Sequence, residues 1–209
     1  MIKANTYKLL WLAGLLLLLG DKGWAQTLPT DGVDARTDAA SLSRLLGSPD
    51  AHQRQRAAEA LAQLAATDQK KLIDGYYLQE KNKTVRLALE WAMYRIGREE
   101  ALFQIVHHLN SSRQEQAIGY LSQLDSPELL YPFLLRGDNK PKVTVGLIEA
   151  LARLGNGETV ERLQKFRDSF APGVAAAAEK AIDSIEARTS EARPKPTGRP
   201  RTISRPGQN

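Results

Sequence analysis

The sequence predicts an all-α fold, a right-handed α-solenoid of about five helical hairpins. Two observations lead to this prediction. The same apolar pattern recurs about every 30 residues, and proline and glycine fall between the recurring segments. A fixed period in this range is the signature of repeat architectures, in which each unit buries its apolar face against its neighbours.

The repeat is centred on five small or aromatic residues spaced 28 to 32 positions apart. These anchors are Ala60, Ala92, Tyr120, Ala150 and Ala181. Aliphatic residues, methionine or alanine recur three positions before, one after and four after each anchor. Such offsets fall within about 100° of a helical wheel, so each window predicts an amphipathic helix with one buried stripe.

A shorter apolar segment precedes each of these helices, which gives a unit of helix, turn and helix. Prolines expected near helix starts are Pro49, Pro127, Pro141 and Pro172, and glycines expected at helix ends are Gly97, Gly155 and Gly157. These placements follow the usual preference for proline in the first turn and glycine after the last. Pro132 falls inside a predicted helix, where we expect it to bend the helix.

The two ends differ from this central part. Residues 1–25 combine lysines, the apolar run LLWLAGLLLLLG and a small residue at position 25, which predicts a secretory signal peptide cleaved after Ala25. An uncleaved membrane anchor is the alternative, although the apolar run is shorter than the roughly 20 residues that span a bilayer. We predict a linker at 26–37, a repeat domain at 38–186 and a disordered, basic, proline-rich tail at 187–209.

Charge is concentrated at the ends of the chain. The whole chain carries +5, residues 1–25 carry +2 and residues 187–209 carry +5, so residues 26–186 carry about −2. A nucleic-acid-binding domain is expected to carry its basic residues on the folded body, so we predict no nucleic-acid partner. The tail is expected to make weak, salt-sensitive contact with an anionic envelope surface, or else to be a soluble end. The chain has no cysteine, which excludes disulfides and thiolate metal sites.

Residues 85–97 (VRLALEWAMYRIG) and 143–155 (VTVGLIEALARLG) resemble the second helix of a HEAT repeat. The likeness is closest to the short HEAT-like repeats first associated with phycobilisome lyases, and it covers about 38–186. It implies a solenoid that binds proteins along its surface. The family also includes bilin lyases and a di-iron hydroxylase that uses His-Glu pairs; this sequence has no His-Glu dipeptide, so that activity is not carried over.

The candidate chemical groups are few. His52, His107 and His108 have no carboxylate at helical spacing, and neighbouring helical residues point about 100° apart. We therefore interpret them as ordinary surface histidines and predict no metal and no cofactor. No nucleophile motif or phosphate-binding glycine loop is present in the sequence, so we predict that the protein is not an enzyme.

The candidate partner-binding site lies on the helix around Ala92. Trp91 and Tyr94 fall on the side of the helical wheel opposite the buried stripe, and Arg95 adjoins them. Ser122 and Gln123 of the next repeat complete the site. Exposed Trp, Tyr and Arg are the side chains most enriched at binding hot spots. The alternative is that Trp91 is covered by a neighbouring helix or by residues 26–37.

These observations predict an exported, periplasmic or secreted, non-enzymatic scaffold that binds a protein or peptide on its concave face. A lyase-like enzyme, or an enzyme accessory acting on a client protein, is the second interpretation. A membrane-tethered form of the same body is the third.

Overall fold

The computed structural model describes residues 31–191, with side chains from Asp38 onward, and this part of the chain is helical without strands. The α-helices are α1 (Asp31–Leu45), α2 (Ala51–Gln63), α3 (Lys70–Gln79), α4 (Lys83–Arg95), α5 (Ala101–His107), α6 (Gln114–Leu121), α7 (Tyr131–Leu134), α8 (Pro141–Leu154), α9 (Gly157–Gln164) and α10 (Pro172–Glu191). Three short 3-10 helices join them: η1 (Thr67–Gln69), η2 (His108–Asn110) and η3 (Pro127–Leu130). The predicted all-α class is confirmed for the described residues. The predicted signal peptide at 1–25 lies outside them.

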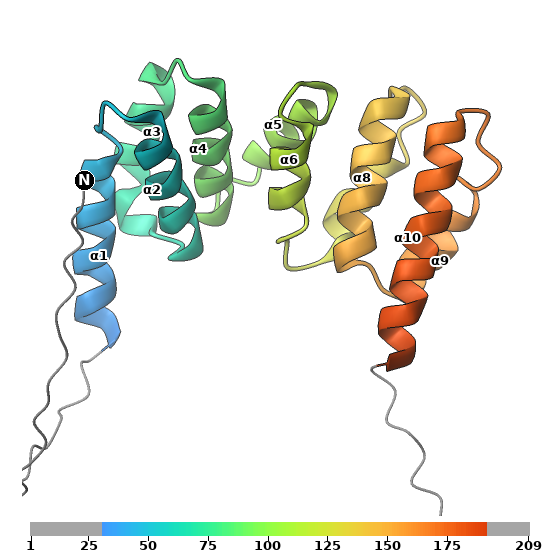
Figure 1. Ribbon diagram of the computed structural model, residues 1–209. Helices are drawn as coiled ribbons and strands as arrows, with labels where there is room; N and C mark the ends of the chain where they lie inside the picture. The colour runs from blue at the N-terminus through green and yellow to red at the C-terminus, as the bar shows by residue number, and fades with distance from the viewer. Residues whose placement is uncertain (1–30, 192–209) are drawn as a thin grey trace, which may run out of the picture.

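The helices follow one another in chain order along a curved row (Figure 1). They form five consecutive contacting pairs: α1 with α2, α3 with α4, α5 with α6, α7 with α8, and α9 with α10. The second helices of the pairs also contact one another in sequence. The contact between α4 and α6 is smaller than those of α2 with α4 and of α8 with α10.

The core is built from the stripes that the sequence marks on the second helices. The residues one position after each anchor are all buried: Leu61, Met93, Leu121, Leu151 and Ile182. Four of the five anchors and all residues three positions before them are also buried. At the positions four after the anchors, Ile96, Leu124 and Ile185 are buried and Leu154 is half-buried, whereas Leu64 has 43% of its surface exposed. It follows the last residue of α2, and the chain turns away at Ala65, whose φ is +45°.

Helix ends follow local chemistry. The Asn82 side chain accepts hydrogen bonds from the backbone N–H groups of Thr84 and Val85 at the start of α4. Gly97, with φ +92°, ends this helix as expected, because glycine adopts that conformation without steric cost.

Two of the expected helix boundaries differ from the structure. Pro132 lies in the first turn of α7, so the first helix of the fourth pair is divided into η3 and α7 instead of being bent. Proline is compatible with that position because the N–H group that it lacks would have no helical acceptor there. Gly157 begins α9 and does not end a helix; Asn156 caps α9 in a capping box with Thr159.

Both ends of the repeat domain extend beyond the predicted boundaries. Helix α1 begins at Asp31, inside the predicted linker 26–37, and α10 continues through 187–191, which we expected to be disordered. The Arg188 guanidinium donates hydrogen bonds to the carbonyl oxygens of Ala152 (2.9 Å) and Gly155 (2.6 Å). The last turn of α10 thus caps the end of α8. Among the described helices, none has the length and apolar character needed to cross a bilayer.

Candidate functional site

Trp91 is buried in the structure and not exposed for a partner, so the alternative prediction, in which a neighbouring helix covers it, is confirmed. Only 3% of its surface is accessible. Its ring stacks with those of Tyr94 and Tyr120, at centroid distances of 5.6 Å to each and interplanar angles of 19° and 2°. The neighbouring helix α6 supplies Tyr120. The wheel of an isolated helix cannot show this cover, because it comes from the next repeat.

Tyr120 connects three successive second helices. Its hydroxyl donates a hydrogen bond to Glu59 Oε1 of α2 at 2.6 Å. Gln116 Nε2 donates to the Tyr120 oxygen at 2.8 Å and to the Thr84 carbonyl oxygen at 3.0 Å. Burial, and then the hydrogen bond to Glu59, raise the pKa of Tyr120 well above the ordinary tyrosine value. The phenol therefore stays protonated and keeps donating this bond.

Tyr94 and Arg95 remain partly accessible beside the buried tryptophan. Arg95 Cζ lies 5.6 Å from the centre of the Trp91 ring, and Arg95 Nη1 lies 3.4 Å from Asp125 Oδ1. Burial is the main cause that raises the pKa of Tyr94. The two residues thus form a small surface supported from below by the Trp91 stack.

Ser122 and Gln123 adjoin this surface but are engaged with their own helix. The Ser122 hydroxyl donates to the Ile118 carbonyl oxygen at 2.6 Å, and Gln123 Nε2 donates to the Gly119 carbonyl oxygen at 2.9 Å. Ser122 is half-buried, whereas Gln123 is exposed. Four of the five predicted residues therefore reach the surface, and Trp91 contacts two of them, Tyr94 and Arg95.

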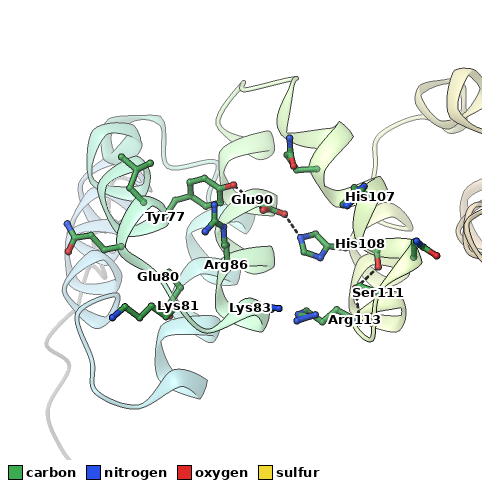
Figure 2. A pocket seen from close by; sticks show the side chains of 14 residues that line it. Tyr77, Glu80, Lys81, Lys83, Arg86, Glu90, His107, His108, Ser111 and Arg113 are labelled. Atoms are coloured by element: carbon green, nitrogen blue, oxygen red, sulfur yellow. Dashed lines mark hydrogen bonds and ion pairs between the residues drawn. The ribbon is translucent and has the colours of Figure 1, made fainter.

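A pocket of about 710 Å³ lies where the α3–α4 pair meets α5 and η2 (Figure 2). We call it the seam pocket. Its lining residues are Tyr77 to Lys81, Lys83, Arg86, Glu90, Gln104, His107, His108, Asn110, Ser111 and Arg113. The sequence did not indicate it, because its wall combines residues from two repeats.

Glu90 is a buried carboxylate in the wall of the seam pocket, with 2% of its surface exposed. Its Oε1 accepts a hydrogen bond from the Tyr77 hydroxyl at 3.2 Å, and its Oε2 lies 3.1 Å from His108 Nε2 (Figure 2). Acidic residues are rarely buried without such partners. Glu90 therefore joins α4 to α3 through Tyr77, whereas its Oε2 lies close to His108 of η2 without a hydrogen bond.

The interpretation of the histidines as ordinary surface residues is wrong for His108. Its side chain is only 20% exposed and faces Glu90. Helical spacing within one segment missed this contact, because the carboxylate comes from a different helix. His52 and His107 are exposed. Within residues 31–191, no three histidine or acidic side chains gather in a way that would hold a metal ion.

The seam pocket has an excess of positive charge. Lys81, Lys83, Arg86 and Arg113 line it, and in the described part of the chain none of them forms an ion pair. Arg86 Cζ stacks 4.4 Å from the centre of the Tyr77 ring.

The two acids of this pocket already have partners. Glu80 Oε2 accepts from Arg54 Nε at 2.8 Å, and this hydrogen bond lowers the pKa of Glu80. Glu90 contacts Tyr77 and His108. The pocket is therefore suited to hold an anionic group.

A hollow of about 270 Å³ adjoins the seam pocket, with which it shares His107 and Asn110. Its apolar wall is formed by Phe103, Val106, Phe133 and Val143, and the rest of its lining is polar: Arg136, Asp138, Asn139 and Lys140. The two phenylalanine rings lie 6.4 Å apart, and 51% of the surface of Phe103 is exposed. Charged and aromatic surfaces thus meet along this side of the molecule.

Comparison with known proteins adds no class beyond the all-helical fold of the described residues. No family model and no curated protein matches it. Among solved structures, it is similar to the crystal structure of an engineered protein, a target of the Northeast Structural Genomics Consortium, at 24% sequence identity. The match covers 74% of this chain and 81% of that chain with a TM-score of 0.34, which is too low to carry an argument.

Proposed function

We propose that the chain is an exported, right-handed α-solenoid of HEAT-like repeats that serves as a non-enzymatic scaffold for a protein or peptide partner. Five contacting helix pairs in a curved row support the repeat architecture. In such an arrangement the second helices line the concave face. Stacking of this kind leaves long surfaces on both layers for binding.

The observation that carries this proposal is the surface formed by Tyr94 and Arg95. Both side chains reach solvent, and both are held by contact with the buried Trp91 ring. A tyrosine and an arginine that are already ordered lose little conformational freedom when a partner binds. Gln123 of the next repeat extends the surface with a polar group.

Crosslinking of the protein in its native compartment, followed by identification of the partner, tests this function. We expect the variant Tyr94→Ala/Arg95→Ala to weaken binding of that partner about tenfold or more, since hot-spot residues contribute about 2 kcal/mol or more. Lys70→Ala/Lys71→Ala is the control, because both residues are exposed and lie on α3, a first helix away from the concave layer. Unchanged affinity in the first variant would contradict the proposed site.

N-terminal sequencing tests the export step separately. A mature chain that begins at Gln26 supports a cleaved signal, whereas an intact N-terminus on a membrane fraction supports the tethered form.

A lyase-like enzyme or enzyme accessory remains the second candidate, and the Glu90–His108 contact favours it. A buried carboxylate that faces an imidazole fixes the orientation of the ring, which is a common arrangement for a general base. A covalent modification of a client that disappears with His108→Ala, and persists with His52→Ala, would support this candidate. An unmodified client in the presence of the wild-type protein would exclude it.

A further inference from the structure

We propose that the seam pocket and the adjoining Phe103–Phe133 hollow form one groove that binds an acidic segment of a partner protein carrying a large apolar side chain. This inference rests on the proposed scaffold function and adds a second surface to it, made by different residues from those around Tyr94.

The charge of the groove is the first argument. Lys81, Lys83, Arg86 and Arg113 lack carboxylate partners within the described residues, whereas Glu80 and Glu90 are already engaged. Lys83 of α4 and Arg113, which precedes α6, extend toward one another from opposite walls (Figure 2). Like charges that face one another repel, and an anionic group between them removes this repulsion.

The body of the chain as a whole does not share the positive charge of this cluster. Residues 26–186 carry about −2 in total, so the unpaired cations are a local excess on an otherwise slightly acidic body. The basic segment 187–209 of the same chain has the wrong sign to occupy the groove. An acidic partner segment has the complementary charge.

The shape of the groove is the second argument. The two cavities share His107 and Asn110, so they adjoin each other. Of the charged residues of the far hollow, Arg136 and Asp138 pair with each other at 3.0 Å, so Lys140 adds one cation, unpaired among the described residues, beside the two phenylalanine rings. An extended peptide offers carboxylates and an apolar side chain along one chain, which matches this succession of surfaces.

Peptide selection on the purified protein, with random displayed peptides as the probe, tests the inference. We expect the selected peptides to be rich in Asp and Glu and to contain a Leu, Phe or Trp. A selected peptide, labelled with a fluorophore, then gives affinities by anisotropy. Its affinity should fall as the salt concentration rises from about 0.05 to 0.5 M, because the rim charges are solvent-accessible.

Matched variants locate the binding surface. Lys83→Glu/Arg113→Glu should weaken the labelled peptide about tenfold or more, since two charge contacts become repulsive. Arg153→Glu/Lys180→Glu makes the same change of charge on α8 and α10 and should weaken it less than about twofold. Phe103→Ala should weaken binding, whereas Phe170→Ala, at an exposed phenylalanine outside the groove, should not.

Thermal melting of each variant shows whether a loss of binding comes from a loss of folding. If Lys83→Glu/Arg113→Glu melts early, Lys83→Gln/Arg113→Gln replaces it, with a smaller expected loss of a few fold. Peptides without acidic bias, no selected peptide, or equal weakening by the control pair would each overturn the inference. Equal binding of inorganic polyphosphate or anionic vesicles, with the same dependence on Lys83 and Arg113, would also overturn it.

The same variants separate the two proposals. A partner or peptide that loses affinity with Tyr94→Ala/Arg95→Ala but not with Lys83→Glu/Arg113→Glu would leave the scaffold function standing and reject the groove. A native partner whose affinity is unchanged by either double variant would reject both the site around Tyr94 and the groove.

Discussion

At the scale of single residues, Trp91 shows how an aromatic side chain connects neighbouring helix pairs in this protein. The ring lies against Tyr94 of its own helix and against Tyr120 of the next second helix. Offset or parallel aromatic pairs add about 0.5–1.5 kcal/mol beyond the area that they bury. Trp91 therefore contributes to the cohesion of the stack, and Tyr94 carries the exposed part of the surface.

Replacement of Trp91 by alanine should destabilise the protein by about 3–5 kcal/mol, because it removes a buried ring and both stacking contacts. Chemical denaturation followed by circular dichroism measures this change. Trp91→Phe should lower the free energy of unfolding much less. Tyr94 is half-buried, so the loss for Tyr94→Ala should fall between those for the two Trp91 variants. A variant Trp91→Ala with unchanged stability would show that the ring is not part of the core.

Glu90 and His108 mark the limit of sequence interpretation at this scale. The stripe of small and aliphatic residues predicts burial around Ala92 because it depends on the period of one helix. The contact between Glu90 and His108 depends on how two repeats meet, and no local period encodes it. The same reason explains why the seam pocket was not predicted.

At the scale of secondary-structure elements, Arg54 and Glu80 join α2 to the end of α3. Arg54 Nε and Nη2 donate to the two carboxylate oxygens of Glu80 at 2.8 and 3.1 Å, and the Glu80 side chain is 9% exposed. The hydrogen bond from Arg54 is the main cause that lowers the pKa of Glu80 in the folded protein.

This lowered pKa predicts a defined pH dependence. The pair stabilises the protein fully above the ordinary glutamate pKa of about 4.3 and loses its contribution as the pH falls through the lower folded-state value. Glu80→Gln should cost about 1–3 kcal/mol at neutral pH and much less in acid. Urea denaturation of both proteins across this range measures the difference. Asp138→Asn, in a fully exposed pair with Arg136, is the control and should change little.

The sequence predicted a helix boundary correctly where one residue alone determines it. The prediction was wrong where a neighbouring residue or segment also determines the boundary. Gly97 ends α4 and Pro141 opens α8, as expected. Pro132 was expected to bend a helix, but the segment before it adopts a 3-10 helix, so proline begins the next one. Gly157 follows the capping residue Asn156, and this cap sets the start of α9.

At the scale of the whole molecule, the contacts between successive second helices differ in extent. Helices α2 and α4, and helices α8 and α10, contact each other more extensively than α4 and α6 do. The Trp91–Tyr120 stack and the hydrogen bond from Gln116 to the Thr84 carbonyl oxygen connect α4 with α6. In a stack of repeats, local stability follows these nearest-neighbour contacts.

Hydrogen exchange under native conditions should therefore resolve at least two cooperative groups of amides, one in α2–α4 and one in α8–α10, with different free energies of opening. Trp91→Ala should increase the difference, because it weakens the contact between the groups. Mass spectrometry of exchanged peptides measures this effect. A single common free energy across all helices would contradict it.

The cap that Arg188 places on the carbonyl oxygens of Ala152 and Gly155 has a consequence for where the chain is trimmed. A truncation that removes residues 187–209 would also remove this cap from the end of α8. Its effect would combine a loss of folding with a loss of tail charge. Residues 192–209 carry five cations and no acid, so their net charge of +5 equals that of 187–209. Removing 192–209 tests adhesion to an anionic envelope surface and leaves α10 complete.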